Sequence, residues 1–450
     1  MLCRTLLIWN ARYYSSLIGT KQYDVVVSGG GMIGTTLACA LAQNPTLKDL
    51  SILLVESGPE KKSNFSKDLP YSNRVSSINL SSKNLLDRIG AWDQIQSTRT
   101  CIVDTMKVWG HSSDDLLEFH KSHNYQDKIS YIVENDLIVD AVTKLLQSSS
   151  IDVMYGMKVA HYELPEQPLD KVRINFESGD TVECKLLLGT DGANSQVRKA
   201  MNVQYIRWDY NEKGIVATVK VSVSNSNKTA WQRFIHTGTV ALLPLSDEYS
   251  SLVWATTPDN AKSLLQMTPE SFVDALNSEF NNPASQNEPI QMVNKVTQDV
   301  FKFFNLSSSN EPIIPPRVIS VEDKSRAAFP LGFGHSVKYV GPSVALLGDS
   351  AHRIHPLAGQ GVNLGFGDIA CFVKLSEESV ANGYPIGHPE CLTKYESSQQ
   401  KQNVPTMISI DLMNKVYRSS LTPVKILGNL GFQLVQAVRP IKRVMMSRVS

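Results

Sequence analysis

Residues 23–34 have the sequence YDVVVSGGGMIG, which predicts the fold of the N-terminal part of this 450-residue chain. The three consecutive valines are typical of a strand buried on both faces of a parallel sheet. Gly29, Gly31 and Gly34 follow in the pattern G-x-G-x-x-G, and an apolar helix is expected after them. In such a turn the first glycine permits the bend, the second lets a pyrophosphate approach, and the third allows close helix packing. The stretch predicts a dinucleotide site.

A second expected strand, residues 51–55, supports this interpretation because it ends in an acid, Glu56. Glu56 lies 22 residues after Gly34, where dinucleotide-binding folds place the carboxylate that binds a ribose. The alternative is an ordinary glycine turn followed by a surface glutamate. The order of strand, glycines, helix, strand and acid favours the dinucleotide site.

Composition excludes several classes of protein. The hydrophobic content of 42% and charged content of 19% are typical of a globular chain. A net charge of +1 argues against a nucleic-acid binder. No run of about 18 apolar residues is present, so we expect any membrane contact to be peripheral. The six cysteines are scattered without a C-x-x-C pair, so we expect no metal site and no disulfide framework.

The first twenty residues differ from the rest of the chain. They contain Arg4 and Arg12, several serines and threonines, and no acid before Asp24. An acid-free segment that contains arginine predicts a mitochondrial transit peptide over residues 1–20. The alternative is an unstructured N-terminus.

A further glycine-rich segment follows an expected strand at residues 344–347. Asp349 comes directly after this strand, so its carboxylate is expected at a sheet edge where it can accept from a ligand hydroxyl. Four glycines then occur in residues 359–367. Such a cluster before a helix indicates close approach of the backbone to a flat ligand.

Together with Asp191-Gly192, these stretches resemble the FAD-dependent aromatic hydroxylases of the para-hydroxybenzoate hydroxylase type. The resemblance covers nearly the whole chain after residue 20. Within that family, residues 208–211 (WDYN), 230–234 (AWQRF) and 241–245 (ALLPL) are similar to the ubiquinone-biosynthesis hydroxylases, and the presequence favours their mitochondrial branch.

The resemblance implies FAD as cofactor and the following FAD-binding residues: Gly29, Gly31, Gly34, Glu56, Arg74, Asn135, Asp191, Asp349, Pro356, Gly359, Gly361 and Asn363. The first three glycines would hold the pyrophosphate, Glu56 the adenosine ribose and Asp349 the ribitol chain. Arg74 would contact the cofactor near the flavin, and Asn135 would make another polar contact to FAD. The residues Pro356, Gly359, Gly361 and Asn363 would belong to the loop along the isoalloxazine. Ser350 stands where the motif more usually has alanine.

The resemblance also implies an activity. The expected reaction is hydroxylation of a polyprenylated phenol at ring position C5 in ubiquinone biosynthesis, through a flavin hydroperoxide and with oxygen as co-substrate. No catalytic acid or base is assigned. A flavin reductase or dehydrogenase of the same fold, or a non-catalytic FAD-bound subunit of a biosynthetic complex, remain alternatives because fold alone does not separate them.

The implied partners are a ferredoxin with its reductase as electron donor and other ubiquinone-biosynthesis proteins in a complex. The implied location is the matrix face of the mitochondrial inner membrane, with peripheral contact and no nucleic acid. From Asp411 onward, basic residues alternate with apolar ones at roughly helical spacing. This pattern predicts an amphipathic helix that docks on a membrane or a partner, or else a structural cap on the FAD domain.

The expected fold class is α/β, with a Rossmann-like FAD-binding domain, a second mixed-sheet substrate domain and a C-terminal helical segment. The predicted divisions are 21–200 and 326–400 for the FAD-binding domain, 201–325 for the substrate-facing sheet, and 401–450 for the helical segment. His352 and His355 are candidates for proton transfer, or for folding their loop through hydrogen bonds. Arg207 and Trp208 are candidates for a pocket wall or for packing.

Overall fold

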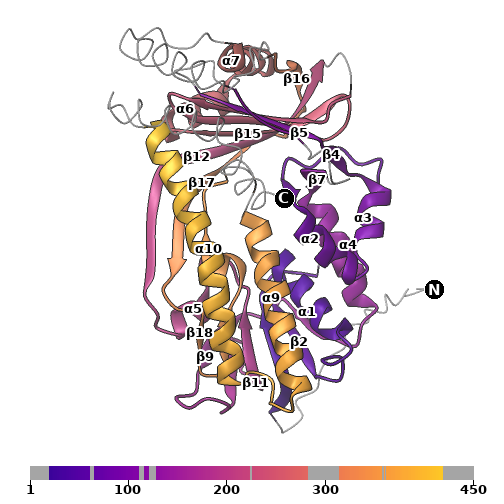
Figure 1. Cartoon of the computed structure of the whole chain (residues 1–450), viewed down its shortest axis with the longest axis vertical. Coiled ribbons are helices and arrows are strands. Elements are labelled where there is room, and N and C mark those ends of the chain that lie inside the picture. Colours follow the sequence, from indigo (N-terminus) through magenta and orange to yellow (C-terminus); the bar gives the residue numbers. More distant parts are fainter. Residues whose placement is uncertain are drawn as a thin grey trace, which may run out of the picture.

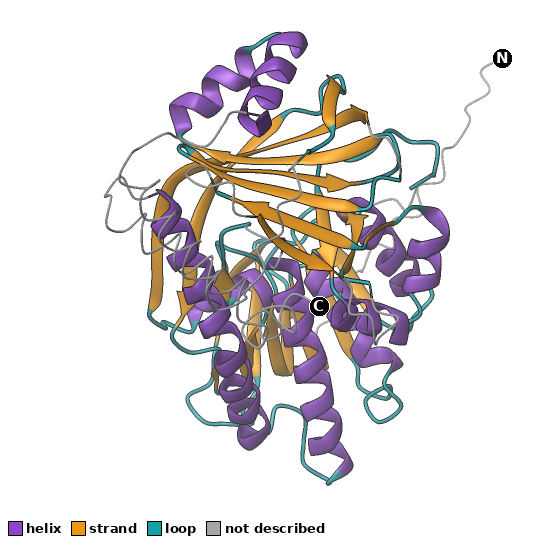
Figure 2. Cartoon of the chain, turned by 45° about the horizontal axis from the view of Figure 1, so that its top comes forward, coloured by secondary structure: helices purple, strands orange, loops and turns teal. Residues whose placement is uncertain are grey.

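The computed structural model describes residues 20–60, 65–110, 116–120, 128–222, 226–281, 314–356, 359 and 361–418. The expected transit peptide, up to residue 19, and the C-terminal residues from 419 lie outside this part. Two large sheets dominate the described chain (Figures 1 and 2). The α/β fold class expected from the sequence is confirmed.

The first sheet has eight strands, six of them in the order β18-β19-β11-β1-β2-β8, with β10 beside β11 and β9 beside β10. The strands are β1 (Lys21–Ser28), β2 (Ile52–Glu56), β8 (Asp152–Tyr155), β9 (Val159–Glu163), β10 (Val172–Phe176), β11 (Thr181–Gly189), β18 (Val340–Gly341) and β19 (Val344–Leu346). Val25, Val26 and Val27 are fully buried, so both faces of β1 are covered. The helices that pack with this core include α1 (Met32–Gln43), α4 (Asn135–Gln147) and α9 (Gly361–Ala381).

The second sheet has nine strands, eight of them in the order β20-β17-β12-β15-β14-β13-β5-β6, with β16 paired to β12. The strands are β5 (Thr105–Trp109), β6 (Leu116–His120), β12 (Tyr205–Ser222), β13 (Thr229–Ile235), β14 (Gly238–Pro244), β15 (Tyr249–Thr256), β16 (Arg317–Val321), β17 (Ala327–Ser336) and β20 (His352–Arg353). Helices α6 (Pro258–Gln266) and α7 (Pro269–Asn281) cover one face through residues such as Phe272. The sheet thus combines strands from residues 201–325 with strands that come before and after this range in the sequence.

A third sheet has three strands, in the order β3-β7-β4. Its strands are β3 (Val75–Ile78), β4 (Cys101–Val103) and β7 (Ser130–Glu134), and the remaining short helices are α2 (Leu80–Arg88), α3 (Trp92–Thr98), α5 (Gln196–Ala200) and η1 (Gly348–Ser350). The sequence predicts helices near residues 81–90, 137–146 and 269–280, and the structure has α2, α4 and α7 there.

The long helix α10 (Pro389–Arg418) runs beside α9 and reaches the second sheet (Figure 1). Asp411 on α10 accepts hydrogen bonds from Trp208 Nε1 at 3.1 Å and from the Tyr210 hydroxyl at 2.9 Å. Trp208 also stacks on Phe333 with ring centroids 3.9 Å apart. Trp208 therefore has a packing role, and the start of the expected amphipathic segment belongs to a helix that begins at Pro389. No helix among the described residues is long and apolar enough to cross a membrane.

Candidate FAD and substrate site

The carboxyl ends of four parallel strands meet at one edge of the first sheet. Ser28 of β1 lies beside Val55 of β2 and Gly189 of β11, and Gly189 lies beside Leu346 of β19. The segments that follow these positions contain the glycine turn, Glu56, Asp191 and Asp349. The register thus brings four stretches of predicted site residues to the same edge, where open α/β sheets bind ligands.

The three glycines of the first turn have different reasons to lack a side chain. Gly29 has φ +109°, and a Cβ there would lie 2.5 Å from the Thr190 carbonyl oxygen. A Cβ on Gly34 would overlap the Gly29 carbonyl oxygen. Gly31 has φ −73°, and a Cβ there would meet nothing within 4 Å. The fold requires Gly29 and Gly34, whereas the open space at Gly31 fits a pyrophosphate at the N-terminus of α1.

Glu56 is turned toward this glycine loop from the end of β2. Its Oε2 accepts from the Gly30 backbone N–H and its Oε1 from the Gly58 N–H, both at 2.6 Å. These bonds fix the carboxylate beside the turn, where the sequence places the ribose contact.

Asp191 and Gly192, which follow β11, are joined by Ser350 to the segment that follows β19. The Ser350 hydroxyl donates to Asp191 Oδ1 at 3.1 Å and accepts from the Gly192 N–H at 3.0 Å. The other Asp191 oxygen accepts from the Gln196 N–H at 2.6 Å, at the start of α5. The serine that departs from the usual alanine therefore links two segments of the site, a role that the sequence did not reveal.

Asp349 and its neighbours are held by Asp368 of α9. Asp368 Oδ2 accepts from the Gly348 N–H at 2.8 Å and lies 2.7 Å from His352 Nε2. Asp349 itself is exposed to solvent, yet the protein atoms crowded around its carboxyl group raise its pKa, while His352 and Arg353 act to lower it. His352 thus serves to fold this segment, and Asp349 is left accessible for a ligand hydroxyl.

Asn363, at the start of α9, has its amide engaged on both sides. Its Oδ1 accepts from Ser82 Oγ at 2.7 Å and from the Asn79 N–H at 3.2 Å. Its Nδ2 donates to the carbonyl oxygens of Ser77 at 2.7 Å and Gly359 at 3.4 Å. Asn363 therefore positions the glycine-rich segment against β3 and α2.

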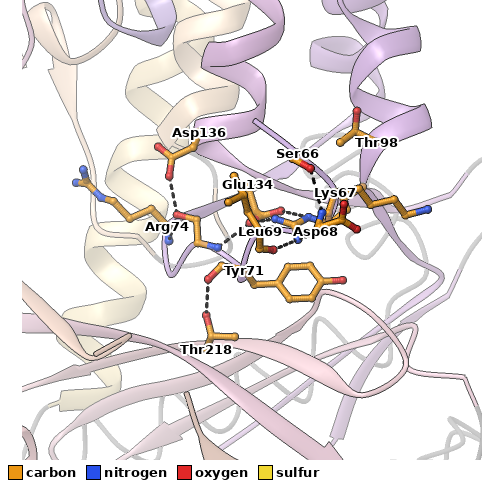
Figure 3. A network of polar contacts seen from close by, with 12 residues as sticks. Ser66, Lys67, Asp68, Leu69, Tyr71, Arg74, Thr98, Glu134, Asp136 and Thr218 are labelled. Atoms are coloured by element: carbon orange, nitrogen blue, oxygen red, sulfur yellow. Dashed lines mark hydrogen bonds and ion pairs between the residues drawn. The ribbon is translucent and has the colours of Figure 1, made fainter. Parts of the chain in front are cut away.

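Arg74 and Asn135 are brought together by the junction of β7 and α4. The Asn135 N–H donates to the Arg74 carbonyl oxygen at 3.0 Å, and Asn135 Oδ1 accepts from Ser76 Oγ at 2.7 Å. The segment before Arg74 crosses to the second sheet, because the Tyr71 carbonyl oxygen accepts from Thr218 Oγ1 at 3.4 Å (Figure 3). Arg74 is exposed and lines a cavity between the second sheet and the three-stranded sheet β3-β7-β4.

Arg99 holds residues 65–72 against Glu134 through its guanidinium group. Its Nε lies 2.8 Å from Glu134 Oε2 and its NH1 donates to the Leu69 carbonyl oxygen at 2.6 Å, while its guanidinium lies over the rings of Phe65 and Tyr71. Burial raises the pKa of Glu134, and the Ser72 N–H and Arg99 act in the opposite direction. Figure 3 shows Glu134 and Tyr71 within this network. No local pattern in the sequence predicts this pairing.

The cavity has a volume of about 1170 Å³ when its open mouth is included. One wall contains the predicted residues Arg74, Asn135, Pro356 and Gly359, together with His355. The opposite wall belongs to the second sheet and is mainly apolar: Val216, Ala230, Trp231, Gln232, Thr239, Ala241, Leu243, Val253, Ala255 and Phe329. An apolar cavity with a few polar groups fits an aromatic ligand. Among the described residues, no group of acids, histidines or cysteines could hold a metal ion.

Comparison with known proteins identifies the family. The family model described as FAD binding domain matches residues 22–302. A Xenopus tropicalis protein named ubiquinone biosynthesis monooxygenase COQ6, mitochondrial, is 42% identical over 97% of this chain and 95% of its own length. The Homo sapiens protein of the same name is 41% identical over 98% of this chain and 95% of its own length. This chain belongs to the COQ6 family of ubiquinone biosynthesis monooxygenases.

Solved structures at lower identity share the fold of this COQ6-family chain. The p-nitrophenol 4-monooxygenase PnpA from Pseudomonas putida DLL-E4 has a TM-score of 0.65 and 16% identity, covering 96% of this chain and 99% of its own. The OxyS anhydrotetracycline hydroxylase from Streptomyces rimosus has a TM-score of 0.62 and 20% identity, covering 95% of this chain and 75% of its own. The chain is thus an FAD-dependent monooxygenase of ubiquinone biosynthesis, as the resemblance implied.

Proposed function

We propose that this COQ6-family monooxygenase hydroxylates position C5 of the aromatic ring of a polyprenylated phenol. The cavity beside the nine-stranded sheet carries the proposal, because one wall combines Arg74, Asn135, Pro356 and Gly359 while the facing sheet wall is mainly apolar. A flat, largely apolar ring would rest against the sheet wall, with its reacting edge toward the glycine-rich segment.

In this proposal FAD, when bound, supplies the activated oxygen that enters the ring. Gly31 leaves room for the pyrophosphate, Glu56 and Asp349 bind the ribose and the ribitol chain, and Asp191 holds its turn in place. Asn363 keeps Gly359 in position, and backbone N–H groups between Pro356 and Gly361 would stabilise negative charge near the ring. The mainly apolar sheet wall limits the access of water.

The proposed location is the matrix face of the mitochondrial inner membrane, which agrees with relatives named mitochondrial. A long prenyl tail is nearly insoluble, since each buried CH₂ group contributes about 0.8 kcal/mol, so the substrate would be taken from a membrane surface or a partner protein. We also propose a ferredoxin and its reductase as electron donor, and association with other ubiquinone-biosynthesis proteins.

A reaction with purified holoprotein, a short-tailed prenylated phenol, oxygen and an electron donor tests this function. Mass spectrometry and NMR should find one added oxygen at C5, and reduced ferredoxin should support faster turnover than NADPH alone. Flavin turnover without an oxygenated product would indicate a reductase. No flavin turnover with any donor would indicate a non-catalytic subunit, and rapid anaerobic bleaching by NADPH would contradict the ferredoxin proposal.

A further inference from the structure

His355 has surroundings that differ from those of His352, although the two lie three residues apart. His352 pairs with Asp368, whereas His355 lines the cavity beside the nine-stranded sheet. The His355 side chain is 1% exposed, and its Nε2 lies 3.1 Å from Glu212 Oε2. Its Nδ1 is shielded from solvent and has no hydrogen-bond partner among the described residues. A buried ring nitrogen without a partner is rare enough in folded proteins to require an explanation.

The partner of His355 is placed by an irregularity in β12. The pairing of β12 with β17 shifts register between Asp209 and Glu212, and Asn211 has φ 53°. Such bulges often lie next to active sites, where they change the direction of a side chain. Glu212 is 2% exposed, and its Oε2 also accepts from Asn414 Nδ2 at 3.2 Å. A buried carboxylate is costly unless it is hydrogen-bonded, and His355 and Asn414 together supply the hydrogen bonds at Oε2.

The hydrogen bond to Glu212 selects one form of the neutral imidazole. A carboxylate at Nε2 favours the proton on that nitrogen, which leaves the lone pair on Nδ1. An imidazole that has a carboxylate at one nitrogen and a free lone pair at the other is the arrangement of a general base with its positioning group.

We propose that His355 is the base of the ring pocket: its Nδ1 accepts the proton of the substrate's ring hydroxyl, and Glu212 positions the imidazole. This inference rests on the proposed function, because it requires a phenol in the cavity. The O–H bond breaks, its electron pair stays on the ring oxygen, and the proton forms an N–H bond at Nδ1. No redox change occurs in this step. The phenolate is more electron-rich at its ring carbons than the phenol, and Glu212 stabilises the imidazolium until the proton returns to the product.

Several ionisable groups surround this pair and enter any pH profile. Tyr210 of β12 lies edge-on to His355, with ring centroids 5.2 Å apart. Burial and the hydrogen bond to Asp411 of α10 raise the pKa of Tyr210, so that it stays neutral through the range of interest. Lys415 pairs with Asp411 at 2.7 Å, and Arg74 lines the same cavity.

The first experiment titrates 4-nitrophenol bound to the holoprotein, because its phenolate absorbs at a longer wavelength than the phenol. The parent protein should lower the apparent pKa of the bound probe by about one unit, which is about tenfold more phenolate below that pKa. His355→Asn should abolish the shift and Glu212→Gln should reduce it. The control His161→Gln, on the exposed strand β9, should retain it. Equal apparent pKa values of the bound probe in the parent protein, His355→Asn and Glu212→Gln would overturn the proposal.

Turnover of a short-tailed prenylated phenol gives a second measurement. At pH 7, His355→Asn should lower kcat by about a hundredfold. The deficit should shrink as the pH rises above the substrate's own phenol pKa, because solvent then supplies the phenolate. An equal deficit at every pH would mean a structural role and would refute the base. If His355→Asn fails to retain FAD, Glu212→Gln decides the outcome by the same pH profile.

Failure of this inference is distinguishable from failure of the proposed function. The parent protein could hydroxylate the ring while His355→Asn and Glu212→Gln show the same probe titration and the same pH profile of turnover as the parent. This result would support the proposed function and refute the role of His355 as the base. The parent protein could instead lower the pKa of the bound probe but form no hydroxylated product. This result would support His355 as a proton acceptor and refute the proposed function.

Discussion

Ser82 in α2 donates a hydrogen bond of 2.7 Å to Asn363 at the start of α9, across 281 residues of chain. The same amide holds the Ser77 and Gly359 carbonyl oxygens with its Nδ2. One buried side chain thus ties the glycine-rich segment to the FAD-binding part of the fold. We expect Asn363 to act on the flavin through the position of this segment.

Asn363→Asp should lower both FAD content and thermal stability. A carboxylate cannot donate to the two carbonyl oxygens, so buried acceptors lose their partner and face a negative charge, at a cost of about 1–3 kcal/mol. Asn382→Asp, exposed beyond the end of α9, is the matched control. Flavin absorbance and thermal unfolding equal to those of the parent protein would contradict the role assigned to Asn363.

Gly31→Arg and Gly34→Ala should impair the protein in different ways, the first in FAD binding and the second in folding stability. Because a Cβ on Gly31 meets no protein atom, the arginine variant should fold with nearly parental stability without FAD, yet bind no flavin. Gly34→Ala should lower the stability of the apoprotein itself, since its Cβ overlaps the Gly29 carbonyl oxygen. Thermal unfolding of apoprotein and the flavin spectrum separate the two effects. Full flavin content in Gly31→Arg would contradict the assignment of the space at Gly31 to the pyrophosphate.

The pair of His352 and Asp368 should stabilise the protein most at low pH. Burial lowers the pKa of His352, but the charge and hydrogen bond of Asp368 outweigh it, and the net shift is upward. A raised pKa in the folded state gives stability that is fully present below the unfolded value, about 6.5, and is lost as the pH rises through the folded value. The Tm difference between the parent and His352→Asn should therefore be larger at pH 6 than at pH 9. A difference that grows with pH would show the opposite shift.

Arg99→Leu should destabilise the protein by about 3–5 kcal/mol, because it leaves the buried carboxylate of Glu134 without its cation. The double variant Arg99→Leu/Glu134→Leu should recover part of this loss. Urea unfolding measures both. Lys394→Gln breaks an exposed pair with Glu390 and should change stability little. A single variant as stable as the parent would mean that the guanidinium is not needed to fasten residues 65–72.

Replacing Arg439, Lys442 and Arg443 with glutamine tests membrane contact by the C-terminus, which lies outside the described residues. Basic side chains near an anionic leaflet each contribute about 1 kcal/mol, so the three should lower vesicle binding by about a hundredfold. FAD content and turnover of a short-tailed phenol should be retained, whereas turnover of a long-tailed substrate in cardiolipin-containing vesicles should fall. Unchanged vesicle binding would favour a structural cap or a docking helix for a partner protein.

The sequence by itself determined the cofactor-binding edge of the first sheet. Buried strands, glycine turns and the acids after them are encoded by local spacing, and parallel pairing brings the ends of neighbouring strands to one edge. For the same reason, Gly29, Glu56 and Asp349 could be proposed from local pattern, whereas Asp191 was implied by the family resemblance. Local pattern also predicted the helices α2, α4 and α7.

Only the tertiary structure decided which distant residues meet. Glu212 reaches His355 across 143 residues because a bulge in β12 redirects its side chain, and no local pattern reports such a bulge. Ser350 became part of the site because its hydroxyl reaches Asp191 on another strand end. The nine-stranded sheet likewise combines β5, β6, β17 and β20 with strands from residues 201–325. Side-chain partners and sheet membership depend on packing between remote segments, whereas strand and turn propensities depend on neighbours in the sequence.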